Sequence, residues 1–177
     1  IYEAKMNIHE LIRQRESVRD YDPNRKVDEI VLTRIIDAGR LAPSAANRQP
    51  WKFVLVSSEE KLEAVRPCYE KVWFQQAPHI LIITGDKTKS WVRSYDGYNS
   101  IETDLAIAMD HIILAAEHEN VGTCWIEAYD PQILADAISL KENEVIFSIT
   151  PLGYQNEGFH KHGNKTRKSI EEVLEII

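Results

Sequence analysis

Glycine is scarce in this chain, and the two common glycine-rich loops that hold nucleotide phosphates are missing from it. Seven glycines among 177 residues make about 4%, below the roughly 7% of average proteins. Neither G-x-G-x-x-G nor G-x-x-x-x-G-K-[ST] occurs, which excludes a Rossmann fingerprint and a Walker A loop. A phosphorylated cofactor would therefore need another kind of binding site.

The chain also has few cysteines, fewer basic than acidic residues, and no long apolar run. Cys68 and Cys124 are far apart and form no C-x-x-C pair, so a disulfide framework or a zinc ribbon is not expected and a reducing cytoplasm is. The balance of 28 acidic and 21 basic residues gives a net charge of −7, unlike that of most nucleic-acid binders. The longest apolar runs, Leu105 to Met109 and Ile112 to Ala116, fall far short of the roughly 20 residues that span a bilayer. We therefore expect a cytoplasmic protein that binds neither nucleic acid nor membrane.

The apolar content is sufficient for one folded domain over residues 1–177. Apolar residues make up 44% of the chain, and its length fits a single domain. Helices and strands intermix without a strict β-α-β alternation, which predicts an α+β fold. The expected helices are Ile8 to Arg15, Asp28 to Leu41, a helix opened by a Ser57-x-x-Glu60 capping box and ending near Arg66, Ile101 to His118, and Asp130 to Leu140. The expected strands are Lys52 to Val56, His79 to Thr84, Thr123 to Ile126 and Val145 to Pro151.

The helix from Ile101 to His118 is unusually apolar. Between Leu105 and Ala116 only Asp110 and His111 are polar. A helix that is apolar nearly all round must be buried on more than one side. Both a central core helix and a subunit interface satisfy this pattern.

Two basic clusters stand out in this acidic chain. In an extended Arg15-x-Ser17-x-Arg19 segment, side chains two positions apart share one face, and two guanidinium groups with a hydroxyl suit a phosphate. A solvated charged turn is the alternative interpretation. The second cluster lies near the C-terminus and consists of His160, Lys161, His162, Lys165, Arg167 and Lys168. Together the two clusters would fit one anionic group approached from both sides.

A loop of small and polar residues, bracketed by prolines, separates an expected helix from an expected strand. It runs from Pro43 to Trp51 and contains Ser44, Asn47 and Gln49. Such amide and hydroxyl groups suit hydrogen bonding to a planar polar ring. An ordinary connection remains the alternative.

Taken in order, these segments resemble the nitroreductase family of FMN-dependent NAD(P)H oxidoreductases. The resemblance covers nearly the whole chain, and R-x-S-x-R followed by P-S-x-x-N-x-Q-P-W is its most specific part. The matching segments are RQRESVRDYD, LAPSAANRQPWKFVLV, QQAPHILIITG, GTCWIEAYDP, ITPLGYQ and NKTRKSIEEV.

The resemblance implies an FMN site built from several parts of the chain. The phosphate and ribityl contacts would fall on Arg15, Ser17 and Arg19, with Lys165 and Arg167 closing from the tail. Glu16 belongs to the same edge, where family members often have Arg or His. Three further contacts with the flavin ring are implied. Pro43, Ser44, Ala45 and Asn47 would lie against the ring, usually that of the neighbouring subunit. The backbone at Glu127 and Ala128 would lie near flavin N5, and Lys71 would lie near the polar edge of the ring.

The resemblance also implies a fold and an activity. The fold would be a mixed, largely antiparallel sheet flanked by helices, in an intertwined homodimer with FMN at the subunit interface. The activity would be reduction of a small acceptor, such as a nitroaromatic or a quinone, by ping-pong hydride transfer with NAD(P)H as co-substrate. It assigns no catalytic side chain, because the cofactor carries the chemistry.

Two other functions remain open alongside the oxidoreductase. A flavin-binding module without turnover would act as a sensor or store. A metal-dependent hydrolase would use His111 and His118, seven residues apart, with His160 and His162, although no H-E-x-x-H motif accompanies them.

An aromatic segment precedes the long helix. Trp91, Tyr95 and Tyr98 lie between Thr84 and Ser100. We hypothesise that they border an open flavin face and favour flat acceptors. Alternatively, they pack on the surface of the long helix.

Overall fold

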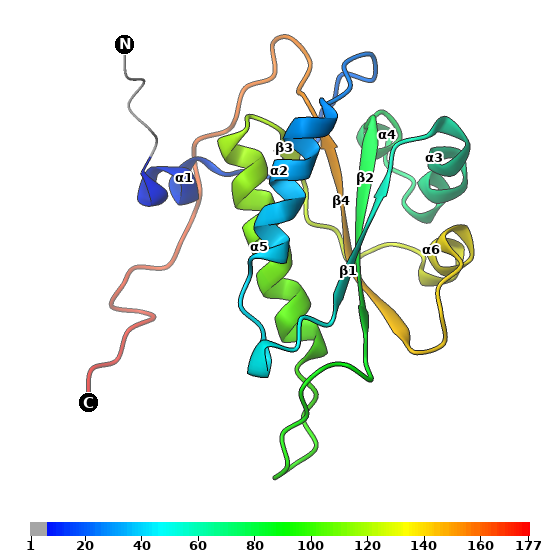
Figure 1. Cartoon of the computed structure of the whole chain (residues 1–177). Helices are drawn as coiled ribbons and strands as arrows, with labels where there is room; N and C mark the ends of the chain where they lie inside the picture. The colour runs from blue at the N-terminus through cyan, green and yellow to red at the C-terminus, as the bar shows by residue number, and fades with distance from the viewer. Residues whose placement is uncertain (1–6) are drawn as a thin grey trace.

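The computed structural model describes residues 7–177, so the first six residues of the expected domain lie outside the described part of the chain. A four-stranded sheet lies between two layers of helices (Figure 1). Its strands are β1 (Trp51–Val56), β2 (His79–Asp86), β3 (Gly122–Thr123) and β4 (Glu144–Gly153), in the order β1-β2-β4-β3. All three neighbouring pairs are antiparallel. The predicted α+β class with a largely antiparallel sheet is thereby confirmed.

Six α-helices accompany this sheet within residues 7–177, and each face of the sheet has its own apolar core. The helices are α1 (Ile8–Gln14), α2 (Glu29–Arg40), α3 (Glu59–Val65), α4 (Val72–Gln75), α5 (Ile101–His118) and α6 (Pro131–Ile138). Helices α2 and α5 cover one face, whereas α3, α4 and α6 cover the other (Figure 1). No helix within residues 7–177 has both the length and the apolar character needed to cross a membrane.

Strand β2 lies at the centre of both cores. Its residues are buried from His79 through Gly85. Because successive strand residues point to opposite faces, Leu81 and Ile83 join the α2–α5 core, while Ile80 and Ile82 join the core under α3 and α6. The continuous apolar run of this strand therefore reflects burial on both faces of the sheet.

Two helices begin at residues whose side chains cap them. Asn7 forms a capping box with Glu10 at α1, and Asp130 accepts hydrogen bonds from the Gln132 and Ile133 N–H groups at α6. The capping box predicted at Ser57 is wrong, because Ser58 is the N-cap of α3 and makes no side-chain cap bond.

The third strand is shorter than predicted. It covers only Gly122 and Thr123, and Ile126 adds an isolated bridge to Ile149. Between them the Cys124 N–H donates to the Thr150 side-chain hydroxyl at 3.1 Å, which interrupts the backbone ladder.

Helix α6 also ends two residues before its predicted end. Its last residue is Ile138, because Ser139 adopts a left-handed conformation (φ 51°). The short helix α4 has no counterpart among the predicted elements. The tail over 170–177 contains no regular helix or strand.

The long helix α5 matches its predicted bounds and packs closely on α2. A Cβ atom added at Gly39 of α2 would lie 2.6 Å from Ile112 Cδ1 of α5, so the glycine permits the close approach of the two helices. Buried residues of α5, including Leu105 and Met109, also pack against the sheet. Ile107 and Leu114 remain partly exposed. Core packing therefore accounts for much of the apolar surface of α5, but not for all of it.

Candidate functional site

The Arg15–Arg19 segment runs extended beside β3. The Val18 N–H donates to the Thr123 carbonyl at 2.8 Å, and the Val18 side chain is fully buried. Burial raises the pKa of the Cys124 thiol, while Arg19, Ser17 and Arg15 all act to lower it. The three side chains thus lie near enough to this thiol to act on its pKa.

The C-terminal tail returns to this segment and is attached to it by hydrogen bonds (Figure 1). The Glu16 carboxylate accepts from the backbone N–H groups of His162 (3.0 Å) and Gly163 (2.8 Å). Lys165 Nζ donates to the Ile12 carbonyl at 2.7 Å. Lys161 forms an ion pair with the buried Glu117 of α5. These contacts hold the two basic clusters of the sequence side by side.

A pocket of about 570 Å³ lies between α1, α5 and the tail, and it brings Arg15, Lys165 and Arg167 together. Desolvation, followed by the charges of Arg15 and Arg167, lowers the pKa of Lys165, against the opposing effect of Glu16 and Glu117. Within the described part of the chain, none of these three cations forms an ion pair with a carboxylate. The pocket therefore carries positive charge that a bound anion would compensate. Its lining consists of Ile12, Arg13, Arg15, Asp110, Leu114, Gly163, Lys165 and Arg167.

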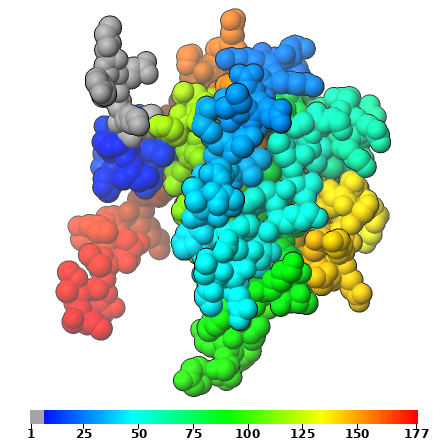
Figure 2. Space-filling view, in the orientation of Figure 1, coloured from blue at the N-terminus to red at the C-terminus, as the bar shows by residue number. Residues whose placement is uncertain are grey.

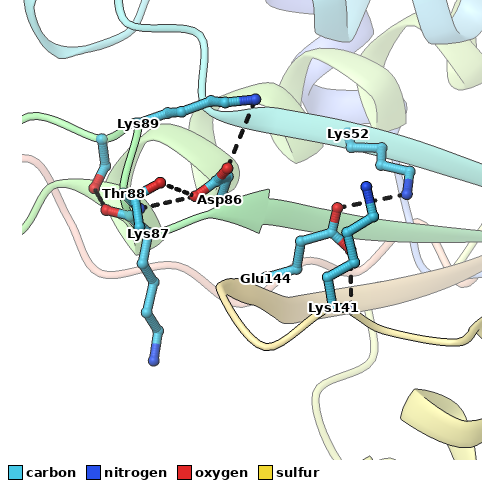
Figure 3. Close-up of polar contacts among 8 residues, drawn as sticks. Lys52, Asp86, Lys87, Thr88, Lys89, Lys141 and Glu144 are labelled. Atoms are coloured by element: carbon cyan, nitrogen blue, oxygen red, sulfur yellow. Dashed lines mark hydrogen bonds and ion pairs between the residues drawn. The ribbon is translucent and has the colours of Figure 1, made fainter.

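A second group of cations, near one end of the sheet, is compensated by acids (Figure 3). Lys52 Nζ lies 3.5 Å from Glu144 Oε1, and Lys89 Nζ lies 3.6 Å from Asp86 Oδ2. A hydrogen bond from the Thr88 hydroxyl lowers the pKa of Asp86, and Lys89 adds to this effect. These lysines have carboxylate partners and do not need an external anion.

The proline-bracketed loop lies near the N-terminal end of α5, away from the basic pocket (Figure 1). Ala46, Asn47 and Gln49 all adopt left-handed conformations, with φ of 50°, 54° and 49°. For residues other than glycine, such conformations cost about 1 kcal/mol or more each and cluster at ligand sites. The Ala45 N–H donates to Asp104 Oδ1 at 2.8 Å, and the Gln49 N–H donates to Ser44 Oγ at 2.9 Å. The surrounding contacts thus hold a strained loop at the surface, with Pro43 and Asn47 exposed.

The other implied flavin contacts lie elsewhere on the protomer. Glu127 and Ala128 are exposed and follow the bridge at Ile126. The Glu127 carboxylate accepts from Trp125 Nε1 at 2.8 Å and borders a second pocket of about 240 Å³. Lys71 is exposed at the N-cap of α4, in the helical layer that lies across the sheet from α5.

The aromatic segment forms an arm that projects beyond the body of the protein (Figure 2). Tyr95 is 95% exposed, and Arg93 stacks over the Tyr98 ring at 4.9 Å. The Tyr98 hydroxyl bonds to Thr103 on the first turn of α5. Packing on the long helix therefore describes Tyr98, whereas Tyr95 contacts little of its own protomer.

The histidines of the metal-hydrolase alternative and the buried Cys68 thiol both have other surroundings than a catalytic site would need. Within residues 7–177, no group of three or more His, Cys, Asp or Glu side chains is placed to hold a metal ion. His111 Nδ1 instead bonds to the Ile107 carbonyl at 3.0 Å. Burial raises the pKa of the Cys68 thiol to about 12, so this group stays protonated at neutral pH.

Sequence reasoning missed Asp104 and Glu117, both buried acids on α5. Their partners, Ala45 and Lys161, are remote in the chain. The only local signal is an acid within an apolar helix. That signal does not reveal what the acid contacts.

The sequence profile of the nitroreductase family matches residues 12–72 and 64–154. A protein of Methanothermobacter thermautotrophicus, provisionally named NADH dehydrogenase/NAD(P)H nitroreductase, is 30% identical over 164 residues, covering 87% of this chain and 80% of its own. The major NAD(P)H-flavin oxidoreductase of Aliivibrio fischeri is 22% identical over 215 residues, covering 96% and 98%.

Solved structures show the same fold. A nitroreductase family protein of Clostridium difficile superimposes with a TM-score of 0.83 at 30% identity, over 96% of this chain and 98% of its own. The FMN complex of a provisionally named nitroreductase from Exiguobacterium sibiricum gives 0.84 at 19% identity, over 99% of both chains. On the evidence of its sequence and its fold, the chain belongs to the nitroreductase family.

Proposed function

We propose that this chain is an FMN-dependent oxidoreductase that uses NAD(P)H to reduce a small electron acceptor, such as a nitroaromatic or a quinone. The observation that carries the proposal is the uncompensated positive charge of Arg15, Lys165 and Arg167 around one pocket. The enzyme class and the cofactors are supported by the flavin oxidoreductase of Aliivibrio fischeri and by the FMN complex from Exiguobacterium sibiricum.

The phosphate of FMN fits the basic pocket. Arg15 and Arg167 offer guanidinium forks that match phosphate oxygens, and Lys165 adds a third cation. Ser17 and Arg19 continue the same edge beside Cys124. A bound phosphate would also offset the charges of Arg15 and Arg167, which after desolvation are the causes that lower the pKa of Lys165.

The ring of the flavin would contact the remaining implied residues. When bound, the flavin supplies the hydride-accepting and hydride-donating chemistry. The backbone at Glu127 and Ala128 would orient the ring, and Lys71 would stabilise negative charge at its polar edge. The Pro43–Asn47 loop would contact the ring bound to a second copy of the chain.

A homodimer would explain the apolar surface that one protomer leaves exposed. Ile107 and Leu114 of α5 are only partly covered. The tail extends away from the body (Figure 1) with five exposed large apolar side chains, Ile170, Val173, Leu174, Ile176 and Ile177. A second copy that packs against α5 and receives the tail would bury both surfaces.

The pocket assignment is tested by the FMN affinity of an Arg15→Ala, Arg167→Ala double variant. Removing charge-assisted hydrogen bonds costs about 1.5 kcal/mol or more, so the dissociation constant should rise by roughly tenfold or more. A Lys52→Ala, Lys89→Ala double variant removes the same charge from the compensated lysines and should bind FMN like the wild type. Equal affinity of all three proteins would overturn the phosphate assignment.

Turnover is tested separately on the wild-type protein loaded with FMN. Oxidation of NAD(P)H in the presence of a quinone or nitroaromatic acceptor is the expected result. A protein that binds FMN tightly and oxidises neither nicotinamide with any acceptor would instead be a flavin store or sensor.

A further inference from the structure

We propose that Asp104 is a positioning residue that fixes the proline-bracketed loop and the aromatic arm relative to one another, and thereby sets how both meet the flavin ring. The inference rests on the proposed function, because it assigns that loop to the ring of a neighbouring copy. Asp104 itself would touch neither the cofactor nor the acceptor.

Asp104 is a buried carboxylate whose two oxygens have different partners. It lies in the first turn of α5 and is 1% exposed. Oδ1 accepts from the Ala45 N–H of the loop at 2.8 Å, and Oδ2 accepts from the Ser100 hydroxyl at 2.8 Å. A buried charge requires such partners, and the positive end of the α5 dipole also favours it.

The bond to Ala45 comes from outside the loop and lies at its strained half. A second bond from outside, from the Asp86 N–H of β2 to the Pro50 carbonyl at 2.9 Å, holds only the far end of the loop. Within the loop, the Asn47 N–H donates to the Ser44 carbonyl and the Gln49 N–H donates to the Ser44 hydroxyl. These bonds shape the turn but do not locate it on the protein. Because left-handed residues persist only where their surroundings enforce them, the Asp104 carboxylate fixes the position of the strained turn.

The other oxygen of Asp104 leads to the aromatic arm. Ser100 is 2% exposed, and its N–H donates to the Trp91 carbonyl at 2.9 Å. Beside it, the Asn99 side-chain oxygen accepts from the Ser90 hydroxyl at 2.6 Å and from the Ile101 N–H at 2.9 Å. The base of the arm is thus attached to the same helical turn as the loop.

The two attached segments both reach the surface. The loop exposes Pro43 and Asn47, and the projecting arm (Figure 2) carries the exposed Tyr95. One buried carboxylate therefore links two surface segments that sequence reasoning assigned to the flavin ring and to the acceptor. Removing the two hydrogen bonds of Asp104 should change the surroundings of the flavin ring and the binding of the acceptor, without removing the phosphate contacts.

Three variants test this role. Asp104→Ala removes both bonds, whereas Asp104→Asn keeps an oxygen for the Ala45 N–H and an amide for Ser100. Glu63→Ala, on the exposed face of α3, removes one negative charge elsewhere and serves as the control. Each protein is loaded with FMN and compared for FMN affinity, visible spectrum, and KM and kcat with one quinone.

We expect Asp104→Ala to bind FMN within about threefold of the wild type, to shift the flavin absorption spectrum, and to raise the KM for the quinone about tenfold, more than it lowers kcat. Asp104→Asn should restore the spectrum and the KM. Equal losses in Asp104→Ala and Asp104→Asn, or a folded Asp104→Ala with wild-type spectrum and KM, would overturn the proposal.

A fourth variant, Ala45→Pro, keeps the test valid if Asp104→Ala fails to fold. Ala45→Pro removes the same N–H from the loop side, at the first position of a short 3-10 turn, where proline is tolerated. The preceding Ser44 is extended, with ψ of 157°, as a residue before proline should be. Ala45→Pro should show the same spectral shift and the same rise in KM, and wild-type values would overturn the proposal.

Hydrogen exchange in the FMN-free protein gives a readout that does not depend on the cofactor. Amides of residues 44–49 should exchange about tenfold faster in Asp104→Ala and at the wild-type rate in Asp104→Asn and Glu63→Ala. Unchanged exchange in Asp104→Ala would overturn the positioning role. Failure of the wild-type protein to bind FMN would instead contradict the proposed function and leave the exchange result standing.

Discussion

The Glu16 carboxylate accepts a 2.8 Å hydrogen bond from the backbone N–H of Gly163, although the two residues are 147 positions apart. Gly163 has φ of +69°, a conformation that glycine adopts at little cost. With the neighbouring bond from the His162 N–H, Glu16 fixes the tail beside Arg15. Glu16 stands where members of the family often have Arg or His. In this chain it holds the segment that carries Lys165 and Arg167.

We predict that Glu16→Ala weakens FMN binding by about three- to tenfold, because two bonds of about 1 kcal/mol each no longer hold the tail. Glu16→Gln can still accept through one oxygen and should be intermediate. FMN titration followed by fluorescence quenching measures the effect. Tighter binding in Glu16→Ala would contradict the prediction, since it would mean that Glu16 acts mainly by repelling the phosphate.

The contact between Gly39 and Ile112 predicts that Gly39→Ala is destabilising. The new Cβ would lie 2.6 Å from two side-chain atoms of Ile112, and such overpacking costs about 1–3 kcal/mol. The higher helix propensity of alanine offsets only about 1 kcal/mol of this cost. Urea denaturation should therefore show a net loss of up to about 2 kcal/mol in the free energy of unfolding.

Ile112→Val provides the matched background for this substitution, because it shortens the side chain that clashes. The cost of Gly39→Ala should be smaller in that background than in the wild type. An equal cost in both backgrounds would show that the clash with Ile112 is not its cause.

His79 predicts a pH dependence of stability. Its Nε2 accepts from the Val27 N–H at 3.1 Å, so the proton resides on Nδ1, which lies 2.7 Å from Ser57 Oγ. Burial, followed by the charge of Lys26, lowers the pKa of His79 from its ordinary value of 6.5. The folded state therefore favours the neutral ring, and its contribution to stability is present above pH 6.5 and lost as the pH falls below that value.

Denaturation between pH 8 and pH 5 measures this effect. His79→Asn should be less stable at pH 8 by about 1–3 kcal/mol, since the buried partners lose their bonds, and should lose less further stability on acidification than the wild type. The exposed His118→Asn is the control and should follow the wild type. Parallel pH profiles for wild type and His79→Asn would refute the assignment.

The exposed tail predicts a role in association. Removing residues 170–177 deletes five exposed apolar side chains and should leave the melting temperature of the isolated protomer nearly unchanged. If a second copy receives the tail, sedimentation should show a dimer dissociation constant raised by about tenfold or more. Lys168→Ala is the control at the same end of the chain, and an unchanged dissociation constant after truncation would contradict the prediction.

Most of the fold follows from local sequence patterns. The bounds of α5, the burial of β2 and the caps at Asn7 and Asp130 all follow from periodicity and capping chemistry. Ser57 shows where local reasoning fails, because its hydroxyl bonds to His79, 22 residues away, and does not cap a helix. A capping motif cannot reveal that a remote partner competes for the same hydroxyl.

The candidate site also contains residues that the sequence identifies and residues whose roles depend on remote partners. Arg15, Lys165 and Arg167 are identifiable by residue type and family resemblance, and the structure brings them to one pocket. Asp104 was missed because its role depends on the Ala45 N–H. Nearly every residue has a backbone N–H, so the residue type does not show which one binds a remote side chain. The roles of Lys71, Glu127 and Ala128 stay predictions, since they depend on a bound ring.

The separation of the basic pocket from the strained loop along α5 has a consequence for subunit complementation. If each flavin takes its phosphate contacts from one chain and its loop from the other, Arg15→Ala and Ala45→Pro damage different halves of every site. A mixed dimer of the two variants then contains one doubly damaged site and one with every residue intact. Two impaired proteins, unfolded and refolded together, should regain activity that neither has alone.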